Sequence, residues 1–232
     1  MSDSPIEGSV LVVFLRRPAL NVGKQRIAAE LGAQAALGLS HCLLAATLED
    51  AMEWQGQIVL APAHHADVDW AHDLLDGQAK IVAQPAGNLG KRINAVDQTV
   101  RKAAPPCVIF IGTDAPSLDN DYLVQARDAL ARFDVVLGPA DDGGVTLMGA
   151  RQPWPKLNDL PWETPELGNA LEAACTDQGL SVNRLDRRYD VDTHSDLARA
   201  YADLHRDPRP ARQQLVQWIA VNGRLHLGFE DL

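Results

Sequence analysis

The stretch that decides the fold is CVIFIGTDAPSLDNDYLVQARDALARFDVVLGPADDGGVTLMG, residues 107–149. It opens with an uninterrupted apolar run at 108–111, which breaks at Gly112 and gives way to a helix-like pattern. Such a run, ended by glycine, predicts a central parallel strand that passes into a loop. Asp114 would then follow the carboxyl end of that strand. Ligands of open α/β sheets bind at this edge, because the connecting loops leave a crevice there.

The rest of the chain repeats the alternation of strand, loop and helix. Apolar runs predict strands at 10–15, 57–61, 80–84, 134–137, 145–148 and 181–185, and helical periodicity follows residue 25 and covers 66–75, 93–100, 119–132, 167–174 and 198–219. This order predicts an α/β fold with a doubly wound, mainly parallel sheet flanked by helices. A length of 232 residues suits one domain, so we expect a single domain over 1–232, with 198–232 as a C-terminal helical extension whose arginines lie on the surface.

Composition excludes several classes of partner. The chain has 21 basic and 31 acidic residues and a formal charge of −10, which disfavours binding to nucleic acid or to an anionic membrane. The polar, acidic start of the chain and the lack of a long apolar run lead us to expect a cytoplasmic protein. We expect the three cysteines to be reduced and buried, and the histidines at 64, 65 and 72 to lie on the surface without binding metal.

A basic loop, residues 16–24, joins the first strand to the first helix. Backbone N–H groups, the helix dipole and Lys24 would suit a phosphate there, although a solvated loop is an equally good interpretation. The P-loop pattern is not met, because Pro18 replaces its first glycine and Gln25 its metal-binding hydroxyl. The GxGxxG fingerprint of dinucleotide-binding folds is absent as well.

Two glycine-containing loops could reach the same edge of the sheet. The segment PAGNLGKR, residues 85–92, either supplies a second set of N–H donors or forms an ordinary turn. In GPADDGG, residues 138–144, glycines such as Gly143 would let the backbone approach a ligand while Asp141 and Asp142 face it. The alternative is a turn built from residues that turns prefer.

A pair of aspartates follows the last predicted strand. Asp190 and Asp192 are two residues apart on an extended segment, so their side chains should point the same way. Two carboxylates on one side, with only the small hydroxyl of Thr193 beyond them, suit a hard divalent cation.

The motifs GTDAPSL, GPADDGG, WETPEL and DVDTHSDL, in this order, resemble the GT-A-like family of radical-SAM/selenodomain-associated transferases. That family is similar to the phospholactate guanylyltransferases, and its fold is that of the nucleotide-diphospho-sugar transferases. The resemblance implies that Asp114, Asp190 and Asp192 hold Mg²⁺ or Mn²⁺, and that Lys24 and Arg26 meet the nucleotide phosphates. It further implies that the segment with Gly87, Leu89, Gly90 and Arg92 lies near the base.

These features lead us to expect a magnesium-dependent transferase that acts on a nucleoside triphosphate or a nucleotide-sugar. The group would pass to a small phosphorylated or hydroxyl acceptor, by nucleotidyl or by glycosyl transfer, with Lys24, Arg26 and Asp114 in catalysis. Thr113, Asp141, Asp142 and Gly143 would contact the substrates. Such catalysis depends on positioning and electrostatics, which agrees with the lack of a convincing nucleophilic triad. The alternative is a GT-A-fold protein without turnover that serves as a nucleotide-binding or scaffold module.

Overall fold

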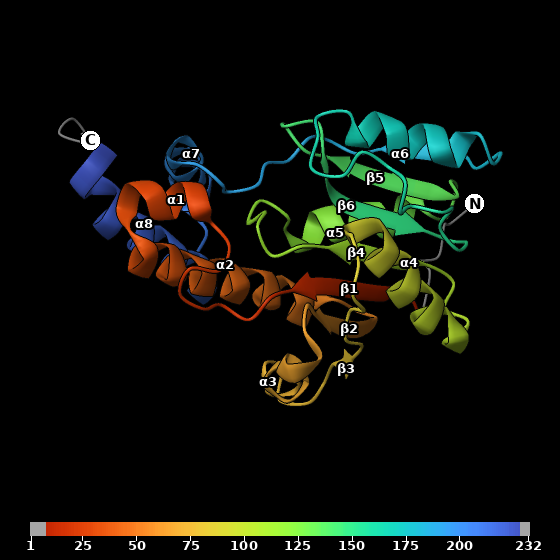
Figure 1. Ribbon diagram of the computed structural model, residues 1–232, viewed down its shortest axis with the longest axis horizontal. Coiled ribbons are helices and arrows are strands. Elements are labelled where there is room, and N and C mark those ends of the chain that lie inside the picture. Colours follow the sequence, from red (N-terminus) through yellow and green to blue (C-terminus); the bar gives the residue numbers. More distant parts are fainter. Residues whose placement is uncertain (1–7, 228–232) are drawn as a thin grey trace.

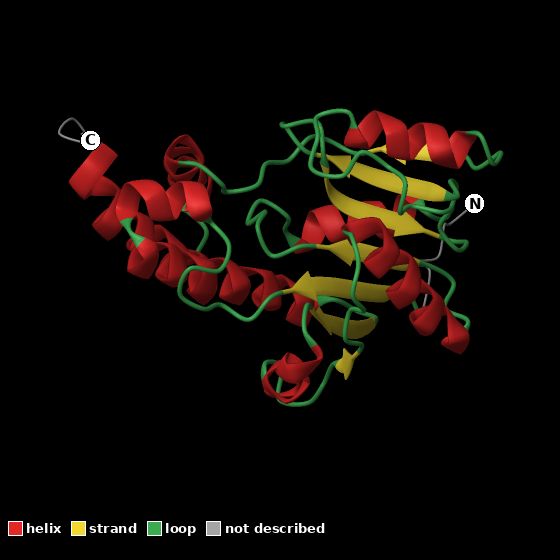
Figure 2. Ribbon diagram, viewed as in Figure 1, coloured by secondary structure: helices red, strands yellow, loops and turns green. Residues whose placement is uncertain are grey.

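A sheet of seven strands forms the centre of the protein (Figures 1 and 2), in the order β3-β2-β1-β4-β6-β5-β7. The computed structural model describes residues 8–227. The strands are β1 (Val10–Leu15), β2 (Gln57–Pro62), β3 (Lys80–Ile81), β4 (Val108–Ile111), β5 (Val135–Pro139), β6 (Val145–Ala150) and β7 (Val182–Arg184).

The sheet is mainly parallel, as the alternation of elements predicts. Parallel pairing joins β1 to both β2 and β4, β2 to β3, and β5 to β7. The exception is β6, which runs antiparallel to both β4 and β5. Only five residues, 140–144, connect β5 to β6, too few for the helical crossover that a parallel pair requires.

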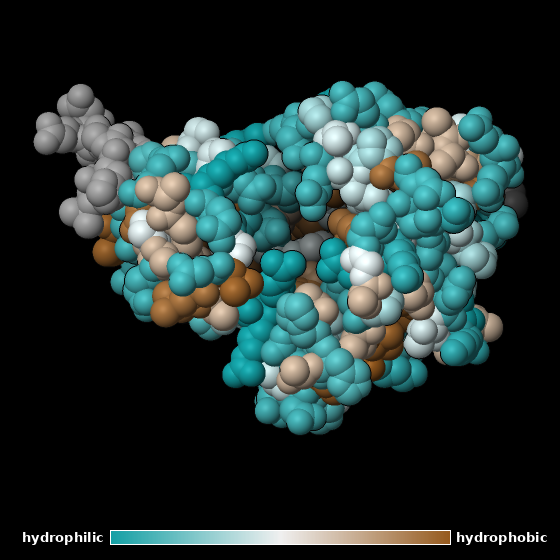
Figure 3. Space-filling view, in the orientation of Figure 1, coloured by the Kyte–Doolittle hydropathy of each residue, from teal (hydrophilic) through white to brown (hydrophobic). Residues whose placement is uncertain are grey.

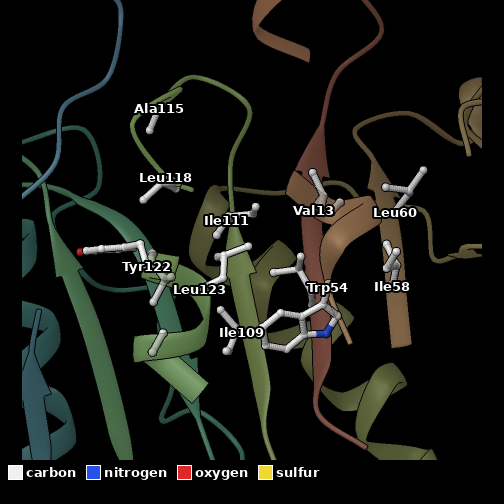
Figure 4. Packing of buried hydrophobic residues seen from close by; sticks show 14 of the residues in the cluster. Val13, Trp54, Ile58, Leu60, Ile109, Ile111, Ala115, Leu118, Tyr122 and Leu123 are labelled. Carbon is white, nitrogen blue, oxygen red and sulfur yellow. The ribbon is translucent and has the colours of Figure 1, made fainter. Parts of the chain in front are cut away.

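Helices cover both faces of the sheet. On one face lie α2 (Ala33–Glu53), α3 (Val68–Asp73) and α5 (Asn120–Ala129), and on the other α4 (Leu89–Val100) and α6 (Leu167–Thr176). Figure 4 shows the first face, where Val13, Leu60 and Ile109 of the strands lie in one apolar cluster with Tyr122 and Leu123 of α5. Apolar burial on both faces explains why the central strands have no polar interruption.

A third apolar cluster lies beyond the sheet, on the left in Figure 1. It joins α1 (Gln25–Leu31) and the first half of α2 to α7 (His194–Leu204) and α8 (Pro210–Leu227). Tyr189 and Val191 are also buried in it. The segment that carries Asp190 therefore runs between this helical cluster and the sheet.

Most predicted elements are shifted by a few residues at their ends, and three differ in more than that. The helix that follows residue 25 is interrupted at Gly32, whose φ of 90° lies outside the helical region, so α1 and α2 are separate helices. The strand at 80–84 is assigned only over Lys80–Ile81, although the amide of Gln84 still donates to Pro62. The helical tail at 198–219 comprises α7 and α8, separated by a turn in which Arg209 binds Asp207.

The prediction that the tail arginines lie on the surface is wrong for Arg212. Its side chain is fully buried, and its guanidinium donates to the Asp50 carboxylate and to the carbonyl of Ala46, both in α2. It also donates to the carbonyls of Pro116 and Leu118, at 3.1 and 3.2 Å. The carboxylate and the carbonyls supply the partners that a buried cation requires.

The three cysteines are free and buried, and the histidines at 64, 65 and 72 are exposed, as the sequence predicts. Within residues 8–227 we find no helix both long and apolar enough to cross a membrane. The division into one domain with an extension at 198–232 stays a prediction, and residues 1–7 and 228–232 of it lie outside the described residues.

Candidate functional site

The carboxyl ends of β1 and β4 open toward the helical cluster, where Figure 3 shows a hollow in the surface. Three adjoining cavities lie along this edge. The basic cavity, of about 400 Å³, includes Arg16, Arg17, Lys24 and Arg92 in its lining. The apolar cavity, of about 250 Å³, includes Phe110, Met148 and Trp162, and the acidic cavity, of about 200 Å³, includes Asp141, Asp142 and Asp196.

Asp192 lines all three cavities, whereas Asp114 lines the basic and apolar ones and Asp190 the apolar and acidic ones. A backbone hydrogen bond of 2.8 Å, from the amide of Val191 to the carbonyl of Asp114, brings the two loops together. The structure therefore places the three predicted carboxylates at one point, although two come from residues about 80 positions later in the chain.

The ammonium group of Lys24 lies between two of these carboxylates. Its Nζ is 2.7 Å from Oδ1 of Asp114 and 2.9 Å from Oδ1 of Asp192, and only 6% of its side chain is exposed. Burial lowers the pKa of Lys24, but the attraction of Asp114 and Asp192 outweighs burial and raises the pKa above its usual value. The lysine is held charged.

Asp190 is the carboxyl group that the ammonium neutralises least. Burial, followed by repulsion from Asp114 and Asp192, raises the pKa of Asp190 to about 7, although Lys24 opposes the rise. The positive charge of one lysine thus has to offset three carboxyl groups. A further positive charge at this point would be favourable.

Two arginines hold the loop that carries Asp114. Arg212 binds the carbonyls of Pro116 and Leu118, and Nε of Arg188 donates to the carbonyl of Ser117 at 3.2 Å. Because these bonds fix the backbone just after Asp114, the position of its carboxylate depends on α8 and on the segment before Asp190.

The loop at 85–92 contributes to the basic cavity through Leu89 and Arg92. Nη1 of Arg92 donates to the buried Gln84 at 3.0 Å. Burial lowers the pKa of Arg92, and the positive charge of Arg16 lowers it further, while Glu163 opposes both. Asn88 accepts a hydrogen bond from the amide of Lys91 and so caps α4.

The glycines of that loop serve packing. A Cβ at Gly90 would lie 2.2 Å from the carbonyl oxygen of Leu157, and one at Gly87, where φ is 133°, would meet the side chain of Lys91. Neither glycine is among the residues that line the basic cavity. Gly90 is required where α4 meets the segment before Trp162.

Of the three residues of the GPADDGG loop that we expected to contact the substrates, the two aspartates line a cavity of the site and the glycine packs elsewhere. Asp141 forms an ion pair with Arg199, and Asp142 accepts a hydrogen bond of 2.9 Å from the amide of Gly144; both aspartates line the acidic cavity. Gly143 faces another way, because a Cβ there would lie 2.1 Å from the carbonyl oxygen of Pro165.

Thr113 lines the basic cavity and Arg26 the acidic one, so these two predicted residues lie on opposite sides of the carboxylates. Residues that sequence reasoning did not single out are Arg16, Arg17, Gln84 and Glu163 in the basic cavity and Arg199 in the acidic one. Arg16 and Arg17 directly follow β1, and this position at a strand's carboxyl end is the signal that could have identified them.

The carboxylates offer hard oxygen ligands, which fit Mg²⁺ or Mn²⁺ in kind. Among residues 8–227, however, no three carboxylate, histidine or cysteine side chains are arranged to hold a metal ion. The ammonium of Lys24 lies between Asp114 and Asp192, where a metal ion would have to meet their oxygens.

Several solved structures share this fold. A crystal structure from Desulfovibrio desulfuricans G20, assigned as a nucleotide-diphospho-sugar transferase, is 22% identical, covers 94% of this chain and 98% of its own, and has a TM-score of 0.86. The CMP:2-keto-3-deoxy-manno-octonic acid synthetase complexed with CTP is 13% identical, with a coverage of 87% and 100% and a TM-score of 0.54. Rv0371C in complex with manganese, from Mycobacterium tuberculosis H37Rv, is 19% identical, with a coverage of 83% and 97% and a TM-score of 0.50. These likenesses establish the predicted fold, that of the nucleotide-diphospho-sugar transferases.

A search of curated proteins finds no significant match. Residues 44–164, just over half of the chain, match the family described as "Uncharacterized protein conserved in bacteria (DUF2064)". This region includes Asp114, whereas the segment after it supplies Asp190 and Asp192 and the segment before it supplies Lys24, which binds Asp114 and Asp192. The chain belongs to the DUF2064 family.

Proposed function

We propose that this protein is a transferase that acts on a nucleotide, with a divalent metal ion as cofactor. The observation that carries the proposal is the basic cavity, in which Arg16, Arg17, Lys24 and Arg92 stand at the carboxyl edge of the sheet and Asp114 and Asp192 close one end. Cations beside a carboxylate cluster suit a phosphate chain and its metal ion.

The named structures of the same fold support this proposal. One is assigned as a nucleotide-diphospho-sugar transferase, one was solved with CTP and one with manganese. By analogy of fold, the basic cavity would take the nucleotide, and the apolar and acidic cavities the acceptor. The relation to phospholactate guanylyltransferases and to radical-SAM-associated transferases, suggested by the four motifs, stays a prediction.

Asp114, Asp190 and Asp192 would hold the metal, and Mg²⁺ or Mn²⁺ bound there would polarise phosphoryl oxygens and offset their charge. Burial and, after it, the negative charges of Asp114 and Asp192 raise the pKa of Asp190 to about 7, and a divalent cation would relieve the repulsion between these charges. Lys24 would then turn from the carboxylates toward the phosphates.

In nucleotidyl transfer, an acceptor oxygen would form a bond to the α-phosphorus while the bond to the bridging oxygen breaks. Pyrophosphate would leave with the electron pair, and a hydroxyl acceptor would give its proton to water. In glycosyl transfer, the acceptor oxygen would attack the anomeric carbon and a nucleoside diphosphate would leave. In either case Lys24 and the arginines of the basic cavity neutralise the charge that develops, without a nucleophilic side chain.

Calorimetric titration with GTP, ATP, CTP and UDP-glucose, with and without Mg²⁺, tests the proposal. We expect at least one nucleotide to bind in a metal-dependent way and Asp114→Asn to weaken that binding at least ten-fold. Asp121→Asn, an exposed aspartate of α5, is the matched control and should bind normally. The absence of metal-dependent binding across the panel would contradict the proposal and favour a scaffold module.

A further inference from the structure

The apolar cavity differs from its neighbours in the charge of its lining. Phe110, Met148, Ile93 and Trp162 contribute to its walls, and Asp114, Asp190 and Asp192 supply its charged groups. Among the described residues that line it, none is lysine, arginine or histidine. The basic cavity on the other side of Asp114 has four cationic side chains in its lining.

We infer that the apolar cavity takes an uncharged, largely apolar molecule that carries a hydroxyl group, and that it rejects phosphorylated compounds. The inference rests on the proposed function, in which this molecule is the acceptor. It narrows the acceptor from phosphorylated or hydroxyl compounds to the neutral hydroxyl class.

Charge is the first reason. An anion in this cavity would face three carboxylates with no cation in the lining, and one divalent cation bound to the three would still leave a net charge of −1. The adjacent Lys24 does not change this, because its ammonium binds Asp114 and Asp192 in this structure and, with metal bound, would turn toward the nucleotide phosphates in the basic cavity. An uncharged hydroxyl can donate a hydrogen bond to a carboxylate, so the same acids favour it.

Size and wall chemistry are the second reason. A cavity of about 150 Å³ lined by apolar side chains holds benzene, so 250 Å³ corresponds to about ten non-hydrogen atoms. Thr146, the one hydroxyl in the lining, already donates to the carbonyl of Gly138 at 3.2 Å. The walls therefore offer apolar contact, and the carboxylate end alone offers polar partners.

The test uses a matched pair of probes, 3-phenyl-1-propanol and its phosphate monoester, observed by saturation-transfer NMR with the full-length protein. We expect at least a five-fold stronger signal for the alcohol. Val145→Trp, at the start of β6, fills the cavity and should reduce that signal at least five-fold. Val221→Trp, at a position that is 62% exposed on α8, is the matched control and should leave it unchanged.

A charge variant makes the test sharper. Val145→Arg places a cation in the lining and should reverse the preference in favour of the phosphate ester. Val145→Phe is the second cavity-filling variant if Val145→Trp lowers the melting temperature, and it should reduce the alcohol signal in the same direction.

Three results would overturn the inference: an ester signal equal to or above that of the alcohol, an alcohol signal insensitive to Val145, or displacement of the alcohol by saturating nucleotide. Calorimetry with nucleotides and Mg²⁺ on the same samples separates the two proposals. An alcohol signal that depends on Val145, without any nucleotide binding, would uphold the cavity's chemistry and contradict the proposed transferase.

Discussion

Nζ of Lys24 lies 2.7 Å from Oδ1 of Asp114, although one residue follows the first strand and the other the fourth. The contact links the basic loop to the carboxylates at the centre of the site. It also sets the ammonium in the place where a divalent cation would meet the same oxygens. The ammonium of Lys24 and a divalent metal ion should therefore compete for the same carboxylate oxygens.

The first prediction concerns that competition. Lys24→Met leaves the carboxylates without their cation, so we expect the metal-free variant to lose about 1–3 kcal/mol of stability. Mg²⁺ or Mn²⁺ should raise its melting temperature more than that of the unchanged protein, because no ammonium has to be displaced. Thermal unfolding in EDTA and in about 10 mM MgCl₂ measures both effects.

Lys91→Met, at an exposed position of α4, is the control for Lys24→Met and should respond to metal like the unchanged protein. An equal response of Lys24→Met and the unchanged protein would show that the ammonium and the metal do not share the carboxylates.

The second prediction follows from Asp190, whose pKa rises from 3.8 to about 7 on folding. Between these two values the folded chain keeps a proton that the unfolded chain has released. Stability should therefore fall as the pH rises from about 4 to about 7. Asp190→Asn removes this fall, so in EDTA the variant should be more stable at pH 8 by up to a few kcal/mol and little changed at pH 4.

Denaturant unfolding at both pH values measures the effect of Asp190→Asn, and Asp121→Asn, at an exposed position of α5, is its control. A variant destabilised at pH 8 would mean that the charged form of Asp190 is the favoured one in the folded chain.

The third prediction concerns the buried pair of Arg212 and Asp50. Without Arg212, the buried carboxylate of Asp50 keeps only Arg209, whose Nη1 is 2.6 Å from Oδ1, so Arg212→Met should cost up to about 3–5 kcal/mol. Burial already raises the pKa of Asp50 to about 6 against the opposing effect of Arg212 and Arg209, and loss of Arg212 raises it further. The cost should accordingly be smaller at pH 5, where Asp50 takes up a proton, than at pH 8.

Chemical denaturation at pH 5 and pH 8 measures that cost, with Arg206→Met, an exposed arginine, as the control. An equal loss at both pH values would show that the lost packing of the guanidinium, and not the lost charge partner of Asp50, causes the destabilisation.

The fourth prediction compares two glycines with nearly the same φ. Gly143 has φ 91° and Gly32 has φ 90°, yet a Cβ lies 2.1 Å from the oxygen of Pro165 at the first and has nothing within 4 Å at the second. Gly32→Ala should cost about 1–2 kcal/mol through its backbone alone. Gly143→Ala should cost clearly more, because the loop must separate from Pro165. Thermal unfolding of both variants measures the two losses of stability. Equal losses would contradict the close approach of Gly143 to Pro165.

Features set by a local pattern could be predicted from the sequence. The apolar run at 108–111 identified β4 because a strand buried on both faces has no polar residue, and Asp114 followed from its position after that run. Asp190 and Asp192 line the same two cavities because residues two apart on extended backbone share a side.

Features that depend on tertiary partners could not be predicted. Arginine usually lies on the surface, and the burial of Arg212 follows from Asp50 and two carbonyls far away in the sequence. In the same way, the sequence suggested a phosphate or solvent as the partner of Lys24, whereas its partners are the carboxylates of two distant loops. The predicted roles of Gly87, Gly90 and Gly143 at a ligand were not distinguishable from packing, because a glycine's neighbours are known only from the fold.

The position of Arg212 late in the chain has a consequence for biosynthesis. Its partner Leu118 precedes it by 94 residues, so at a translation rate of about 5–20 residues per second several seconds separate their synthesis. During that interval the nascent chain holds Asp50 without this guanidinium and the loop after Asp114 without this anchor. All seven strands are therefore synthesised before the side chain that fixes the Asp114 loop. A pause in translation between Leu118 and Arg212 would prolong the state in which this loop lacks its anchor.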